Sequence, residues 1–105
     1  MAITRITLFK IPDPAHQQQL LEKYKTLKQD ALKDGTPYIL SILAGPTKDD
    51  QRRQGYTLAI VSGFACEEDM KYYDEGCAAH AEIKRLARSV HQGVMMVFFE
   101  AGVVA

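Results

Sequence analysis

The sequence has no surplus of charge of either sign, since 13 Lys and Arg residues balance 13 Asp and Glu residues among 105. Binding to nucleic acid through its phosphates needs a positive surplus, so this balance argues against nucleic acid as the main partner. It also gives no reason to expect an anionic membrane surface as a partner. No apolar run approaches the length of a membrane span, and the start, MAITRITLFK, is too polar for a secretory signal. We therefore expect a soluble, cytoplasmic protein without a membrane partner.

Cysteine is scarce, with Cys66 and Cys77 as the only two. Without a secretion signal we expect reduced thiols rather than a disulfide. Their spacing fits no metal-binding motif and no Cys/His cluster joins them, so the sequence predicts no metal site. The charged loop over residues 45–55 lacks a phosphate-cradling glycine pattern, and we expect no cofactor. Repeats, low-complexity segments and linkers are absent, which predicts one domain over residues 1–105.

What the sequence does contain is a regular succession of strand and helix patterns. Strand-like alternation covers residues 3–11, 37–45, 56–64 and 93–100. Helical spacing runs from Asp13-Pro14 to a stop at Gly35, and again over about 67–74 and about 78–89. Gly63 predicts a bulge near the end of the third strand. The order β-α-β-β-α-β predicts an α+β, ferredoxin-like subunit, with a four-stranded antiparallel sheet and its helices on one face.

Several of the predicted strands are apolar on both faces, although the helices can cover only one. The last strand alternates Val94, Met96 and Phe98 with Met95, Val97 and Phe99. The second strand is expected to place Tyr38, Leu40 and Ile42 opposite Ile39 and Leu43. Leaving such a face wet forgoes about 1.5–3 kcal/mol per large apolar side chain and promotes association. We therefore expect a homodimer in which two sheets pack face to face.

Four stretches, ITLFKI, GYTLAIVSGF, YYDEGCAAH and GVMMVFFE, follow one another along nearly the whole chain. This ordered set resembles the stress-responsive dimeric α/β-barrel (Dabb) family, and most of all its fungal members. The resemblance implies a ferredoxin-like subunit that pairs sheet to sheet as a dimeric α/β barrel. Many members have no assigned activity, whereas one plant member is a polyketide cyclase that closes a ring by an aldol reaction without a metal. Its His-Tyr pair corresponds to His80 and Tyr73, and a second pocket tyrosine corresponds to Tyr24.

The stretch YYDEGCAAH, residues 72–80, breaks the second helical segment and is the predicted mouth of a cavity between sheet and helices. An imidazole titrates near neutrality, so His80 is a candidate general base, with the hydroxyl of Tyr73 or Tyr72 as its partner. The alternative is a structural role, with His80 bonded to the backbone of the preceding loop. The other predicted ligand-binding residues are Tyr24, Arg5, Thr7, Phe9, Ile60, Ile83, His91 and Met96.

For several of these residues a structural role competes with a role in the site. Tyr24 lies on the inward stripe of the first helix, where a core tyrosine with its hydroxyl near the surface is the alternative. Arg5 shares a strand face with Thr7 and Phe9, and we expect it to form an ion pair with an acid. The resemblance places His91 at the position of a pocket tryptophan in the plant cyclase, which implies a residue at the pocket or its rim.

Three functions remain open on this basis. The first is a homodimeric protein of unassigned activity that binds a small apolar or phenolic ligand. The second is a cofactor-free, polyketide cyclase-like lyase with His80 as general base and Tyr73 as its partner. The third is a purely structural stress protein. A cavity in which His80 and a tyrosine hydroxyl converge favours the first two, whereas a closed, dry core with His80 bonded to the backbone favours the third.

Overall fold

Four strands form one antiparallel sheet in the computed structural model, which describes residues 2–105. They are β1 (Ile3–Phe9), β4 (Ile39–Pro46), β5 (Leu58–Phe64) and β6 (Val94–Phe99). The loop between β4 and β5 holds a short 3-10 helix, η1 (Gln51–Arg53). The order across the sheet is β4-β5-β1-β6, and each neighbouring pair is antiparallel. This confirms the predicted ferredoxin-like sheet.

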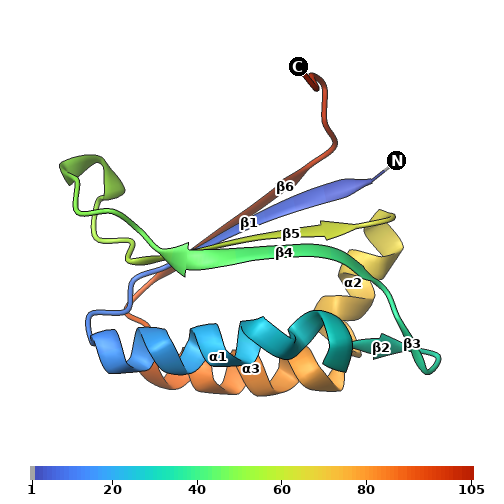
Figure 1. The fold of residues 1–105 in the computed structure, drawn as a ribbon, viewed down its shortest axis with the longest axis horizontal. Helices are drawn as coiled ribbons and strands as arrows, with labels where there is room; N and C mark the ends of the chain where they lie inside the picture. The colour runs from blue at the N-terminus through green and yellow to red at the C-terminus, as the bar shows by residue number, and fades with distance from the viewer. Residues whose placement is uncertain (1) are drawn as a thin grey trace.

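Three helices lie on one side of this sheet (Figure 1). They are α1 (Pro14–Asp30), α2 (Glu67–Glu75) and α3 (Ala78–Val90). Asp13 caps α1, because its side chain accepts a hydrogen bond from the Ala15 amide at 2.8 Å. The break between α2 and α3 falls at Gly76 and Cys77, whose amides both donate to the carbonyl oxygen of Tyr72. Beyond the break, α3 runs beside α1 along the sheet (Figure 1).

The core lies between the sheet and the helices. Alternate residues of β1 and β5 are buried, so the two strands share one inward face. The buried apolar side chains on that face are Ile3, Phe9, Leu58, Ile60 and Phe64. Three polar side chains interrupt this apolar surface, because Arg5, Thr7 and Ser62 are buried among them. A few polar groups within an apolar lining are typical of a ligand pocket.

The predicted end of the first helix at Gly35 is wrong. α1 ends at Asp30, and a small hairpin of β2 (Leu32–Lys33) and β3 (Thr36–Pro37) follows it. Asp34 and Gly35 form the two-residue turn of this hairpin, with φ angles of 52° and 77°. Such turns need left-handed backbone at both positions, and Asp-Gly is a favoured pair for them. Gly35 therefore closes a hairpin instead of a helix.

The irregularity predicted near Gly63 lies in the neighbouring strand. The register of β4 shifts between Ile39 and Ser41, opposite the end of β5, so Leu40 is the extra residue. Ile39 is buried, and Ile42, three positions later, packs against the same core. The expected alternation that placed these two isoleucines on opposite faces is therefore wrong, because the bulge changes which residues point inward.

The face of the sheet away from the helices is apolar and open to solvent. The register places Met95 and Val97 of β6 beside Leu8 and Ile6 of β1 on this face. Val97 is 52% exposed, and Leu43 of β4 is 72% exposed. The inward-facing residues of β6 are exposed as well, and they are Val94, Met96 and Phe98. The predicted apolar character of both faces of the last strand is thus confirmed.

Candidate functional site

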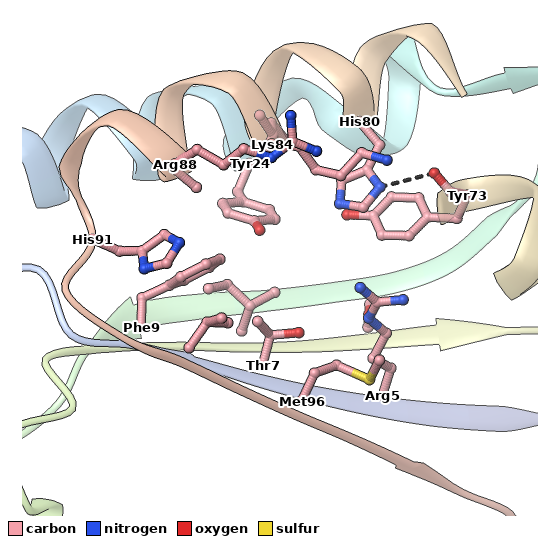
Figure 2. A pocket seen from close by; sticks show the side chains of 15 residues that line it. Arg5, Thr7, Phe9, Tyr24, Tyr73, His80, Lys84, Arg88, His91 and Met96 are labelled. Carbon is pink, nitrogen blue, oxygen red and sulfur yellow. Dashed lines mark hydrogen bonds between the residues drawn. The ribbon is translucent and has the colours of Figure 1, made fainter. Parts of the chain in front are cut away.

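A cavity of about 200 Å³ lies between the sheet and α3, at the polar centre of the core (Figure 2). The strands contribute Arg5, Thr7 and Phe9 from β1, Ile60 and Ser62 from β5, and Val94 and Met96 from β6. The β1 and β5 residues are buried, whereas Val94 and Met96 are 50% and 39% exposed. The cavity therefore opens toward the edge of the sheet that β6 forms.

The helices supply the remaining walls of the cavity. These residues are Tyr24 from α1, Tyr73 from α2, His80, Ile83, Lys84, Ala87 and Arg88 from α3, and His91 directly after α3. The residues of α3 recur every three or four positions and so lie on one face of the helix. Every predicted site residue except Tyr72 lines this one cavity.

Tyr72 points away from the cavity. Its hydroxyl donates to the carbonyl oxygen of Leu32 at 2.8 Å, and its ring meets the ring of Tyr38 edge-on at 5.2 Å between centroids. Successive residues of a helix project about 100° apart, so two adjacent tyrosines cannot face the same space. Tyr73 is therefore the tyrosine of this pair that faces His80, and Tyr72 supports the β2–β3 hairpin instead.

His80 is held by both the backbone and the ring of Tyr73. Its Nδ1 lies 2.8 Å from the Tyr73 carbonyl oxygen. Because a carbonyl oxygen only accepts hydrogen bonds, Nδ1 carries the hydrogen and the lone pair of the neutral ring is on Nε2. The two rings are stacked, with centroids 3.5 Å apart and planes inclined by 10°. The backbone bond that the structural alternative predicts for His80 is therefore present, and the imidazole has one fixed orientation.

The cavity holds a neutral imidazole and neutral phenols at pH 7. Burial lowers the pKa of His80 to about 4, and the cations of Arg5 and Lys84 act in the same direction. The Tyr73 carbonyl and the Asp74 carboxylate oppose this shift. Burial also raises the pKa of Tyr73 and of Tyr24 above the ordinary value for a phenol. Figure 2 shows both tyrosine hydroxyls pointing into the space between the sheet and α3.

Arg5 connects the floor of the cavity to the helix break. Its Nη1 lies 2.8 Å from both carboxylate oxygens of Asp74, which confirms the expected ion pair. The guanidinium carbon lies 5.3 Å from the ring centroid of Tyr73. Lys84 donates a hydrogen bond to the backbone carbonyl of Asp74. Asp74 therefore holds one cation through its side chain and a second through its backbone.

His91 lies at the end of the cavity away from His80 (Figure 2). Its ring is tilted against Phe9, with 5.8 Å between the centroids. Its Nδ1 is buried, and no group among residues 2–105 forms a hydrogen bond with it. Buried polar atoms normally have a partner, so this nitrogen is an exception in the wall of the cavity.

Sequence reasoning did not identify Ser62, Lys84, Ala87, Arg88 and Val94 as lining residues. The spacing of α3 contains the signal that would have found three of them. His80 and His91 were already candidates, and positions 84, 87 and 88 fall between them on the same helical face.

Residues 2–105 contain neither a metal-binding cluster nor a membrane-spanning helix. No group of three or more His, Cys, Asp or Glu side chains in this range is arranged to hold a metal ion. No helix in this range is long and apolar enough to cross a membrane.

The fold and the site together define a ferredoxin-like α+β subunit with a cavity between its sheet and its helices. The chain belongs to the stress responsive A/B barrel domain (Dabb) family, whose model matches residues 3–101. A relative from Gibberella zeae, described as a fusaristatin A biosynthesis cluster protein, is 42% identical over 99 residues. The match covers 93% of this chain and 72% of the relative.

Solved structures share the fold at much lower identity. A hydroxynitrile lyase from Passiflora edulis has a TM-score of 0.79 at 14% identity, over 99% of this chain and 97% of its own. SnoaB, a cofactor-independent oxygenase from Streptomyces nogalater, has a TM-score of 0.75 at 9% identity, over 98% and 95%. A dimeric ferredoxin-like protein of unknown function from Jannaschia sp. CCS1 has a TM-score of 0.78 at 12% identity, over 96% and 100%. At these identities the likeness shows the fold alone.

Proposed function

We propose that the protein is a cytoplasmic homodimer that binds a small apolar or phenolic ligand in the cavity beside His80. The observation that carries this proposal is the convergence of polar groups in a mostly apolar space. The hydroxyls of Tyr24 and Tyr73 point into it, and Phe9 and Ile83 are among its apolar walls (Figure 2). A concave, largely apolar pocket with a few fixed polar groups is the usual form of a small-molecule site.

Four further observations support parts of this proposal. The apolar residues on the helix-free face, such as Leu43 and Val97, favour a dimer, because a second copy would remove them from water. The Jannaschia protein of the same fold is described as dimeric. The Gibberella relative is described as part of a biosynthesis cluster, which is consistent with a ligand drawn from small-molecule biosynthesis. Cys66 and Cys77 are both free thiols, in keeping with a cytoplasmic location.

A second candidate function is a cofactor-free lyase of the polyketide cyclase type. The fixed tautomer of His80 favours it, because Nδ1–H is anchored to the Tyr73 carbonyl and the Nε2 lone pair is free at pH 7. In such a reaction His80 Nε2 would remove a proton from an activated carbon, and the neutral Tyr73 hydroxyl would donate to the enolate oxygen that forms. The low pKa of His80, about 4, makes it a weak base for this task.

A third candidate is a purely structural role. The same hydrogen bond and ring stack that orient His80 also join the end of α2 to the first turn of α3. The cavity disfavours this candidate, because stabilisation of the helix break does not require an open space beside His80.

Thermal shift with a panel of phenols and small aromatic compounds tests the proposed function. We expect at least one compound to raise the melting temperature of the wild type, because a ligand that binds only the folded state stabilises it. Thr7→Leu fills the cavity from β1 and should abolish the shift, while Leu32→Ala in the distant hairpin should preserve it. Equal shifts in wild type and Thr7→Leu would show that the compounds bind elsewhere.

The same panel separates binding from catalysis. Loss of product formation in His80→Gln, with unchanged melting temperature and retained binding, would establish the lyase. A ligand that binds wild type and His80→Gln alike, and is recovered chemically unchanged, would leave binding as the function.

A further inference from the structure

The charged residues that line the cavity are all cations. They are Arg5, Lys84 and Arg88, and no Asp or Glu is among the lining residues. Two of the three already have partners, because Arg5 is paired with the Asp74 carboxylate and Lys84 donates to the Asp74 carbonyl. Arg88 forms no ion pair with any other residue between 2 and 105.

Arg88 lies at the mouth of the cavity. It is exposed on α3, one turn after Lys84, while Val94 and Met96 of β6 form the other side of the opening. A guanidinium at the edge of an apolar space attracts an anion more strongly than one in open water, because the local dielectric constant is lower. Its planar donors also match the two oxygens of a carboxylate.

We infer that the ligand carries an anionic group, and that Arg88 binds this group at the cavity mouth while the body of the ligand lies against Phe9 and Ile83. This inference rests on the proposed function and specifies the class of ligand. The favoured anion is a carboxylate on an aromatic or other cyclic body of about one ring, which suits a cavity of about 200 Å³.

A different role for Arg88 is stabilisation of α3. A cation in the last turn of a helix interacts favourably with the helix dipole, and Arg88 occupies the last turn. That role affects stability, whereas the inferred role affects affinity for anions. Arg85 is the matched control, because it is an exposed arginine on the same helix that does not line the cavity.

The experiment is calorimetric titration with three probes that share one ring: 2-hydroxybenzoate, its neutral amide and phenyl phosphate. We expect the wild type to bind 2-hydroxybenzoate more tightly than the amide. Arg88→Gln should lower the affinity for 2-hydroxybenzoate by about tenfold and change the affinity for the amide by less than about twofold. Arg85→Gln should leave both affinities unchanged. Added salt should weaken binding of 2-hydroxybenzoate and leave that of the amide unchanged.

The outcomes separate this inference from the proposed function. Equal affinity for 2-hydroxybenzoate and the amide, or equal losses in Arg88→Gln and Arg85→Gln, would overturn the anion site and leave ligand binding intact. A change in melting temperature of Arg88→Gln without a change in affinity would assign Arg88 to the helix alone and would also overturn it. Tighter binding of phenyl phosphate than of 2-hydroxybenzoate would support the anion site and would make phosphate, instead of carboxylate, its preferred anion. If no probe binds, or if Thr7→Leu binds them all as the wild type does, the proposed function itself fails.

Discussion

The ring of Tyr73 lies flat on the ring of His80, and the carbonyl oxygen of the same tyrosine binds His80 Nδ1 at 2.8 Å. One residue thus fixes both the plane and the tautomer of the imidazole. Because Tyr73 ends in a hydroxyl inside the cavity, the group that orients the histidine also presents a donor to any ligand beside it. The helix break at Gly76 and Cys77 makes this possible by bringing residues seven positions apart into contact.

The first prediction concerns the pH dependence of stability. The pKa of His80 is lowered from 6.5 to about 4, so the unfolded state takes up a proton before the folded state does. The stability that the neutral imidazole contributes is therefore complete above about pH 6.5 and is lost as the pH falls toward about 4. At about pH 5 we expect the titration of His80 to lower the unfolding free energy of the wild type by roughly 2 kcal/mol relative to its value above pH 6.5. Urea unfolding at a fixed protein concentration measures this loss.

His80→Gln and His16→Gln are the matched pair for this measurement. Glutamine does not titrate, so His80→Gln should show a shallower fall in unfolding free energy between about pH 7 and pH 5. His16 is only partly buried on α1 and does not line the cavity, so His16→Gln controls for the substitution itself. Parallel curves for all three proteins would contradict the assigned protonation state of His80.

The second prediction concerns the ion pair between Arg5 and Asp74. Arg5 is buried, so Asp74→Ala leaves a guanidinium without its carboxylate, while Arg5→Met removes the charge and keeps the apolar stem. We expect Asp74→Ala to lower the unfolding free energy by about 1–3 kcal/mol and to cost more than Arg5→Met. The double variant should cost less than the sum of the two single variants. Denaturant unfolding of the four proteins gives these values.

An exposed pair with the same spacing provides the comparison. Arg52 and Asp50 also lie 2.8 Å apart, but the Arg52 side chain is 88% exposed. Arg52→Met should therefore change stability by less than about 0.5 kcal/mol. If this variant costs as much as Asp74→Ala, burial is not what gives the Arg5 pair its strength.

Most of the fold follows from local patterns in the sequence. The alternation of Ile3, Phe9 and Ile11 with Ile6 and Leu8 suffices to orient β1, because a strand has a period of two. The end of α1 did not follow, since a glycine after a helical stripe suits a helix stop as well as a hairpin turn. Asp34-Gly35 is also a local signal for a two-residue turn that pairs Leu32 and Lys33 with Thr36 and Pro37, and this signal competes with the helix stop.

The sequence predicted a residue of the site only where a strand face or a helix stripe points that residue into the cavity. Thr7 and Phe9 were placed correctly because they share a face of one strand. The choice between Tyr72 and Tyr73 could not be made, because it depends on the rotation of a short helix at a break. Arg88 shares the helical face of His80, but its place at the opening of the cavity depends on where β6 lies, and the spacing of α3 does not give that position.

The third prediction concerns the hairpin turn. Gly35 has a φ of 77°, which a residue with a Cβ adopts only at a cost. Gly35→Ala should therefore lower the unfolding free energy by about 1 kcal/mol, although the added methyl group would meet no atom within 4 Å. Gly102→Ala is the control, because its surroundings are equally open and its φ is not in the left-handed region. Identical melting curves for the two variants would contradict the two-residue turn at Asp34 and Gly35.

The fourth prediction concerns the apolar face opposite the helices. Val97 lies in the middle of β6, beside Ile6 on the helix-free face, and is half exposed in one subunit. If two sheets pack face to face, Val97→Glu places a charge in a dry interface, where it has no partner and cannot keep its water. We expect the wild type to sediment as a dimer at low micromolar concentration and Val97→Glu to sediment as a folded monomer. Leu32→Glu makes the same chemical change in the β2–β3 hairpin, away from that face, and should remain dimeric (Figure 1). A wild type that sediments as a folded monomer would contradict the sheet-to-sheet dimer. If Val97→Glu sediments as a dimer, the dimer interface lies on another surface.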